Sequence, residues 1–453
     1  MLRKVIKRLA GSLVLLAVLA AALVAWQAPA QAPDEALPVT DSRPHVPLKC
    51  QGVSSCTAAA CHNAGGPDGS KRSEYTTWFR HDRHAHAFAV LGGKQSEIIA
   101  RNLAAGGKIV PAKENTLCLK CHALAPELAG KKHAYVNDDG VSCESCHGRA
   151  EKWLSIHYLP EWQKKSDEDK LHYGMTPTKN LVYRAKQCAA CHVGSPENDL
   201  NHDLYAAGHP PLYYEFSAFL GSMPKHWSEQ EEKARYPDLE LRAWAVGQLT
   251  SAQAALELLA ARAEHKQKPW PEFAEYNCYA CHHSLRVGSP STPIAGPGRR
   301  TPGALPWNSW FTALLPDAVS AFSNDRESKL LGQQVTTLGQ QMEQPLPNRE
   351  QVAGEASSLA HQLGRLLSSS ERLRYDEATL RALIGKLPDQ AGYVAPADWE
   401  QAAQAYLAGA AVYRTRRDLH PGYANALLKR TLDDLRRRLE VPDRYENRAG
   451  FDK

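Results

Sequence analysis

Several motifs and charge patterns that mark common protein classes are missing from this 453-residue sequence. It contains no Gly-rich phosphate loop, no G-x-S-x-G and no H-E-x-x-H, which removes the usual signatures of nucleotide binding, serine hydrolysis and zinc proteolysis. No run of Lys and Arg alternates with aromatic residues, and the formal net charge is only +5, so we expect no nucleic-acid surface. No cysteine follows residue 281, although eleven occur up to that point. The residues that can carry chemistry therefore lie before the C-terminal region.

The N-terminal segment predicts export from the cytoplasm. A basic start, MLRKVIKR, is followed by the uncharged stretch Leu9–Trp26 and by small residues at 28–30. Eighteen apolar residues are many for a cleaved signal and just enough to span a bilayer, so residues 1–30 are either a signal peptide or an N-terminal membrane anchor. The basic residues before this stretch fit the positive-inside orientation. We therefore expect a periplasmic or other extracytoplasmic protein, either free or anchored to the inner membrane.

The cysteines form a repeated pattern. Four C-x-x-C pairs are each followed at once by His, and a fifth pair has a wider spacing: CLKCH (118–122), CESCH (143–147), CAACH (188–192), CYACH (278–282) and CTAAACH (56–62). Chance would place only ~0.01 copies of C-x-x-C-H in such a chain, so four copies predict covalent c-type haem attachment. The two thiols bind the vinyl groups of one haem, and the adjacent His binds its iron. Disulfides, a zinc ribbon or a thioredoxin-like site would not require a His after every second cysteine.

The pattern predicts five covalently attached c-type haems. The attachment residues are Cys56, Cys61, Cys118, Cys121, Cys143, Cys146, Cys188, Cys191, Cys278 and Cys281. The iron ligands from the motifs are His62, His122, His147, His192 and His282. Cys50 is left over, and it is either an unpaired thiol, a partner for intermolecular pairing or a thiolate close to the first haem.

His157 lies ten residues after His147 in the stretch DGVSCESCHGRAEKWLSIHY (139–158). If this stretch were helical, the two histidines would be ~15 Å apart along the helix axis. Two nitrogen ligands of one iron are only ~4 Å apart. We therefore expect His157 to bind a different haem from the one held by Cys143 and Cys146, which would link two neighbouring cofactors.

The sequence resembles the multihaem cytochromes c of the cytochrome c-554 type over residues 50–290. The matching stretches are EYTTWFRHDRHAHAFAVL (74–91), DGVSCESCHGRAEKWLSIHY (139–158), KQCAACHVGS (186–195), NHDLYAAGHPPLYYEF (201–216) and EFAEYNCYACHHSL (272–285). The resemblance implies that His84, His157, His202 and His209 are distal iron ligands. Arg83 stands where the family often has Pro, and His81 or His86 is an alternative to His84.

Five irons and four distal histidines leave one iron without an assigned sixth ligand. His226, His133 or His172 can complete it, or the iron is five-coordinate and open to a small molecule. The resemblance implies an electron carrier that works with redox protein partners, including a membrane quinol-oxidising component. The alternative is an oxidoreductase that acts on a small nitrogen or sulfur compound at one open haem. The sequence favours the carrier over an enzyme with its own substrate.

The expected fold is mainly α, with short helices and long loops around stacked haems and a helical C-terminal region. The predicted parts are the signal peptide or anchor (1–30), a tether (31–49), a pentahaem cytochrome c domain (50–286), a Gly/Pro-rich linker (287–306) and the C-terminal region (307–453). Helices are expected over 239–266, 316–342, 350–370, 376–387, 397–417 and 422–439. In the helix 397–417 the predicted packing face is Trp399, Ala402, Ala403, Tyr406, Leu407, Ala410 and Tyr413.

Overall fold

The computed structural model describes residues 48–420 apart from six gaps, and scattered positions between 428 and 439. The gaps are 129–130, 132–133, 279–280, 283–303, 321–324 and 371–398. The described part is built from helices and contains no strand, only two isolated β-bridges, so the predicted mainly α class is confirmed. The predicted signal or anchor, nearly all of the tether and most of the linker lie outside the described residues. The proposed domain limits stay predictions.

Most helices in the first half of the described chain are short. The α-helices there are α2 (Glu74–His81), α3 (Lys94–Ala104), α4 (Thr116–His122), α5 (Cys143–His147), α6 (Pro160–Gln163), α7 (Asp167–His172), α8 (Leu181–His192), α9 (His202–Ala207), α10 (Phe216–Ser222) and α11 (Glu229–Arg235). The 3-10 helices are η1 (Val53–Cys56), η2 (Arg83–His86), η3 (Ala89–Gly92), η4 (Pro126–Leu128), η5 (Ala134–Asn137), η6 (Ala150–Lys152) and η7 (Phe273–Glu275). Long loops connect them, as the sequence predicts.

The α-helices from residue 239 onward are longer, except for the six-residue α13. They are α12 (Leu239–Glu264), α13 (Leu315–Ser320), α14 (Asp325–Met342), α15 (Arg349–Ser368) and α17 (Trp399–Leu419). Of the helix expected over 316–342, the structure describes α13 and α14, and residues 321–324 between them lie outside the described residues. The helix expected over 376–387 also lies outside them. Among the described residues, no helix is both long enough and apolar enough to cross a membrane.

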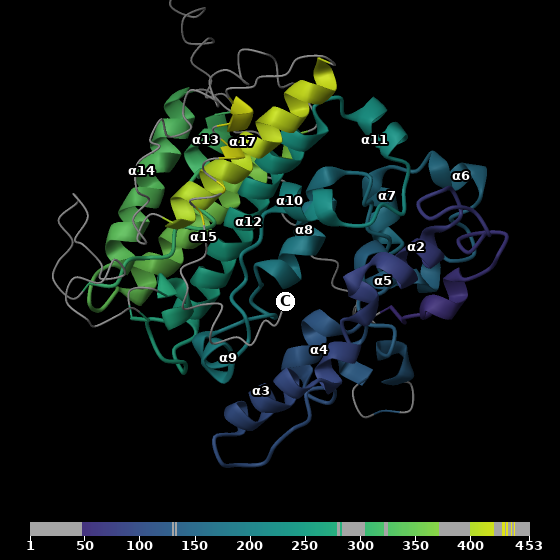
Figure 1. The fold of residues 1–453 in the computed structure, drawn as a ribbon. Helices are drawn as coiled ribbons and strands as arrows, with labels where there is room; N and C mark the ends of the chain where they lie inside the picture. Colours follow the sequence, from purple (N-terminus) through teal and green to yellow (C-terminus); the bar gives the residue numbers. More distant parts are fainter. Residues whose placement is uncertain are drawn as a thin grey trace, which may run out of the picture. The chain divides into compact units, whose positions relative to one another are not determined.

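Helix α12 is the centre of the main hydrophobic core. It packs against α8 and α10 and against α13, α15 and α17 of the C-terminal region (Figure 1). Its apolar periodicity predicts one buried face, but residues 241–252 are buried all round, because helices cover it from several directions. Helix α8, which carries the CAACH motif, and the cysteine-free C-terminal helices therefore pack against the same helix, α12.

Close packing against α12 depends on a glycine. A Cβ atom on Gly247 would lie 2.5 Å from Cβ of the buried Phe216 in α10. Gly247→Ala should therefore lower the free energy of unfolding by about 1–3 kcal/mol through overpacking. The matched control is Gly354→Ala in α15, where nothing lies within 4 Å. That change should raise stability by about 0.5–1 kcal/mol, because alanine is the better helix former. Denaturant unfolding followed by far-ultraviolet circular dichroism measures both, and equal effects would contradict the close contact.

Candidate functional site

Three of the cysteine motifs form the last turn of a short capped helix. The motif histidines 122, 147 and 192 end α4, α5 and α8. Asn115 and Asn180 cap the starts of α4 and α8 through their side-chain oxygens, and Ser142 begins α5 with a capping box. Positions i, i+3 and i+4 share one face of a helix, so both thiols and the imidazole of a motif point to the same side. Such a helix end can therefore offer two thiols and one iron ligand to the same haem.

His157 faces His62 of the CTAAACH motif. The two ring centroids are 6.1 Å apart and the ring planes differ by 13°. His157 is close in sequence to the CESCH motif, but it points to the histidine of a different motif. The geometry thus agrees with the expectation that the segment 143–157 links two neighbouring sites.

Three further motif histidines each face a histidine from elsewhere in the chain. The pairs and centroid separations are His84–His192 at 6.0 Å, His122–His209 at 6.5 Å and His147–His226 at 6.3 Å. Their ring planes cross at 85°, 80° and 76° respectively. Each pair joins a motif to a segment that is distant in sequence, so the pairing follows from the fold and not from local spacing.

The separations match two imidazoles on one metal ion. A metal–nitrogen distance of ~2 Å, plus about 1.1 Å from that nitrogen to the ring centre, gives about 6.2 Å between the centroids. The four observed distances lie between 6.0 and 6.5 Å. The donor sets therefore fit haem iron bound between two histidines, with the motif cysteines beside it.

Hydrogen bonds orient most of these rings. The Nδ1 atoms of His122, His157 and His209 lie 2.8–2.9 Å from the carbonyl oxygens of residues 87, 154 and 210. Nδ1 of His84 lies 2.8 Å from Oδ1 of Asp82, and Nδ1 of His62 lies 3.3 Å from Oε2 of Glu74. When Nδ1 donates to an oxygen, Nε2 is left as the free acceptor that can bind a metal. The protein thus fixes which nitrogen of each ring is offered.

Burial keeps the best-enclosed imidazoles neutral. It lowers the pKa of His147 and that of His192 to about 4, and it lowers the pKa of His226 as well. His192 also stacks on the buried ring of Tyr214, with centroids 5.1 Å apart. Neutral imidazole is the form that binds a metal ion, so these rings are in the correct state at neutral pH.

The structure separates the candidates for the unassigned sixth ligand. His226 faces His147 at 6.3 Å, whereas His172 is exposed and contacts Tyr173. His133 lies outside the described residues. Within the 81–86 cluster, His84 faces His192, while His81 is exposed and pairs with Asp68 at 2.7 Å. The alternative ligands His81 and His86 receive no support, because both side chains point to solvent.

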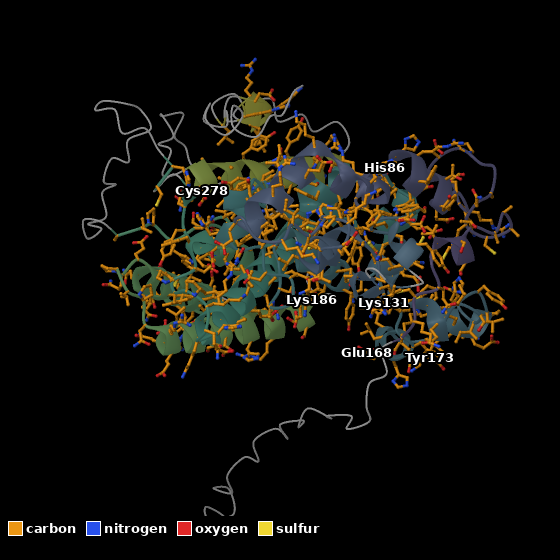
Figure 2. The ribbon with its side chains drawn as sticks, turned by 90° about the horizontal axis from the view of Figure 1, so that it is seen from below. His86, Lys131, Glu168, Tyr173, Lys186 and Cys278 are labelled. Carbon is orange, nitrogen blue, oxygen red and sulfur yellow. The ribbon has the colours of Figure 1, made fainter. Side chains whose placement is uncertain are left out.

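The CYACH motif (278–282), which comes last along the chain and is called the fifth motif from here on, is the least completely described. Cys278, Cys281 and His282 are described, but residues 279–280 are not, and no ring contact joins His202 to His282 among the described residues. His202 lies beside the segment that leads into the motif, because its ring contacts Phe273 at 5.8 Å and its backbone N–H donates to Glu272. In Figure 2 the labelled Cys278 lies well apart from His86, which follows the ligand candidate His84. Cys278 is thus placed apart from the segment that carries His84.

Cysteines from different motifs lie close together in two places. The neighbouring Cys143 thiol lowers the pKa of Cys56, and the neighbouring Cys191 thiol lowers the pKa of Cys121. All eleven cysteines are free of disulfide bonds. Burial raises the pKa of Cys50 to about 11, so its thiol stays protonated at neutral pH. The idea of a thiolate at Cys50 therefore finds no support.

Two carboxylates at the site were not foreseen from the sequence. Glu144, between the cysteines of CESCH, is buried and accepts hydrogen bonds from the backbone N–H groups of Gln51, Gly52 and Ala150. It therefore fixes the start of the CTAAACH segment against α5. Asp82 is buried too, and it orients His84. Asp82 could have been recognised from the sequence, because its partner His84 is only two residues away. Glu144 could not, because two of its three partners are more than ninety residues away.

The paired histidines and motif cysteines define a c-type cytochrome with covalently bound haem and a role in electron transfer. Residues 56–148 match the profile of one protein family, described as cytochrome c554 and c-prime. The match spans the motifs at 56–62, 118–122 and 143–147, and it confirms the resemblance to a cytochrome c554-type family. Cytochromes c are typically extracytoplasmic. No curated protein and no solved structure gives a significant match to the chain.

Proposed function

We propose that the chain is a pentahaem electron carrier in which all five irons are held by two histidines. The proposed ligand pairs are His62 with His157, His122 with His209, His147 with His226, His192 with His84, and His282 with His202. The facing rings of the first four pairs carry this assignment. His202 is assigned to the fifth pair because of the resemblance and because its ring contacts Phe273. The motif cysteines supply the thioethers.

The haems, when bound, supply one-electron transfer at potentials set by axial ligands, burial and nearby charge. The chain contributes the fixed orientation of each imidazole, the neutral state of the buried histidines and the close approach of one motif to the next. A carrier works with every iron closed to small molecules. A histidine opposite His147 closes the iron that the sequence leaves without a sixth ligand.

The position of His226 favours the carrier over the alternative oxidoreductase. An enzyme acting on a small nitrogen or sulfur compound at haem iron needs an exchangeable coordination position. The observation that weighs against it is the 6.3 Å separation of the His147 and His226 rings. The proposed partners are redox proteins of a respiratory chain, including a membrane quinol-oxidising component. Periplasmic location, with or without a membrane anchor at residues 1–30, belongs to the same proposal.

Haem counting and cyanide titration test this function together. Denatured haem measured against protein should give five haems per chain, one for each motif. Electron paramagnetic resonance of the oxidised protein should show low-spin iron only, and cyanide should leave the spectrum unchanged. A count of four would remove the wide CTAAACH motif from the set. A high-spin signal that cyanide converts to low-spin would support the oxidoreductase.

A further inference from the structure

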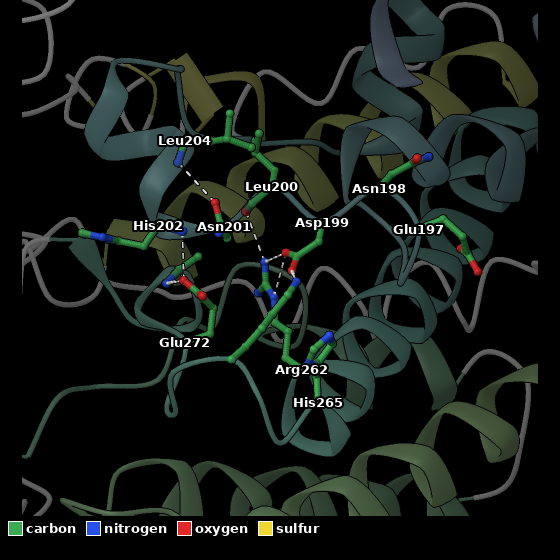
Figure 3. Close-up of polar contacts among 12 residues, drawn as sticks. Glu197, Asn198, Asp199, Leu200, Asn201, His202, Leu204, Arg262, His265 and Glu272 are labelled. Carbon is green, nitrogen blue, oxygen red and sulfur yellow. Dashed lines mark hydrogen bonds and ion pairs between the residues drawn. The ribbon is translucent and has the colours of Figure 1, made fainter. Parts of the chain in front are cut away.

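Arg262 near the end of α12 joins two chain segments that serve the fifth motif. Its side chain is only 8% exposed, and its guanidinium makes hydrogen bonds to three acceptors (Figure 3). Nη2 donates to Oδ1 of Asp199 at 2.6 Å and to the Leu200 carbonyl oxygen at 3.1 Å. Nη1 donates to Oε1 of Glu275 at 2.6 Å. One planar cation therefore holds the segments 199–200 and 275 to each other.

One of these segments leads to a proposed ligand of the fifth iron, and the other leads to an attachment cysteine of the same motif. Asn201 follows Leu200 and caps α9, whose first residue is His202. Glu275 ends η7, three residues before Cys278. A second tie lies beside the first, because Glu272 accepts a hydrogen bond from the backbone N–H of His202 at 2.9 Å. The ligand segment and the motif segment are thus joined by side chains at two points.

A cavity lies beside this junction. Arg262, Glu275 and Cys278 line it, together with Tyr205 of α9 and the indole rings of Trp307 and Trp310. Trp307 is fixed there by a hydrogen bond from its Nε1 to Glu275 and by a β-bridge to Tyr276. The attachment residue Cys278, Arg262 and Tyr205 of the helix that begins at His202 thus line one cavity.

We propose that Arg262 is the positioning residue that keeps His202 opposite His282 and so keeps the fifth iron six-coordinate. This inference rests on the proposed function, which assigns these two histidines to one iron. The guanidinium is suited to the task, because its rigid fork reaches two carboxylates and a carbonyl oxygen at once. A lysine offers a single point charge and cannot span the same three acceptors. Without the fork, only the hydrogen bond from the His202 backbone N–H to Glu272 is left of the two ties described above.

The test compares Arg262→Lys and Asp199→Asn with a control at the same carboxylate. Lys268 donates to Oδ2 of Asp199 at 3.1 Å, but its side chain is 46% exposed. Within the described part of the chain, no other side-chain hydrogen bond or ion pair joins it to residues 199–200 or 275. Arg262→Lys and Asp199→Asn should each create a high-spin ferric signal and bind about one equivalent of cyanide per chain. Lys268→Gln should leave all irons low-spin. Asp199→Asn and Glu275→Gln carry the test if Arg262→Lys fails to fold.

His202→Ala separates this inference from the proposed function. If His202→Ala opens one iron to cyanide while the Arg262 and Asp199 variants bind none, the ligand assignment stands and the positioning role is overturned. If His202→Ala opens no iron, the proposed ligation of the fifth haem is wrong, and the role of Arg262 falls with it. A purely structural arginine would lower the melting temperature without creating a cyanide-binding iron.

Discussion

His226→Gly should open the iron held by Cys143 and Cys146. The His226 ring stands 6.3 Å from the His147 ring, and burial lowers the pKa of both, so His226 is neutral and placed to bind. Removing it leaves His147 as the sole protein ligand of that iron. We expect cyanide binding to rise from none to about one equivalent per chain, together with a high-spin ferric signal. Added imidazole should fill the space left by the side chain and restore the low-spin spectrum.

The matched control for this prediction is His172→Gly. His172 is the other described candidate for the same role, but its side chain is exposed and contacts Tyr173. This change should leave every iron low-spin. The opposite outcome, an open iron in the His172 variant and none in the His226 variant, would show that the facing rings of His147 and His226 do not share a metal.

The parts of this site that depend on short spacing could be predicted from the sequence. A C-x-x-C-H motif is a single helical turn, so its chemistry is contained in five residues. His157 faces His62 as expected. The helical premise of that expectation is wrong, however, because α5 ends at His147 and residues 148–157 form the short η6 and turns. The helical class followed from the same kind of local evidence. Local rules succeed here because helix geometry converts spacing directly into direction.

The parts that depend on distant contacts could not be read in this way. His226 was one of three equal candidates, because nothing near it in the sequence indicates that its loop reaches α5. Arg262 looked like an ordinary polar residue near a helix end, since its partners at 199 and 275 are set by tertiary folding. A charged side chain gains such a role only when two segments are brought to it.

The packing face of α17 was predicted wrongly, and its composition explains the error. Among the side chains of the predicted face that the structure describes, which do not include Trp399, only Ala402 and Ala403 are fully buried. The other apolar residues that are buried on this helix are Ala405, Ala408, Ala411 and Val412. Tyr406, Leu407 and Tyr413 are only partly buried. Alanine occurs on every side of this helix, so the face that packs closely is made mostly of small side chains. The prediction followed the larger residues, which lie on a different face.

His157→Ala should change the haem of the CTAAACH motif and leave the haem of Cys143 and Cys146 intact. The reason is that His157 faces His62, with parallel rings 6.1 Å apart, while His147 is paired with His226. The variant should therefore bind about one equivalent of cyanide, at an iron whose remaining ligand is His62. Cyanide binding at the iron of His147 instead would contradict the separation of the two sites.

The ring planes make the two outcomes distinguishable in one spectrum. The planes of His62 and His157 differ by only 13°, whereas those of the other three described pairs cross at 76–85°. Nearly parallel imidazoles split the two iron d orbitals that interact with them and give a rhombic low-spin signal. Nearly perpendicular imidazoles leave those orbitals close in energy and give a signal dominated by one large g value. His157→Ala should therefore remove one rhombic component, whereas the control His209→Ala should remove a large-g component and keep the rhombic one. A His157 variant that lost a large-g signal would mean that His157 binds an iron other than that of His62.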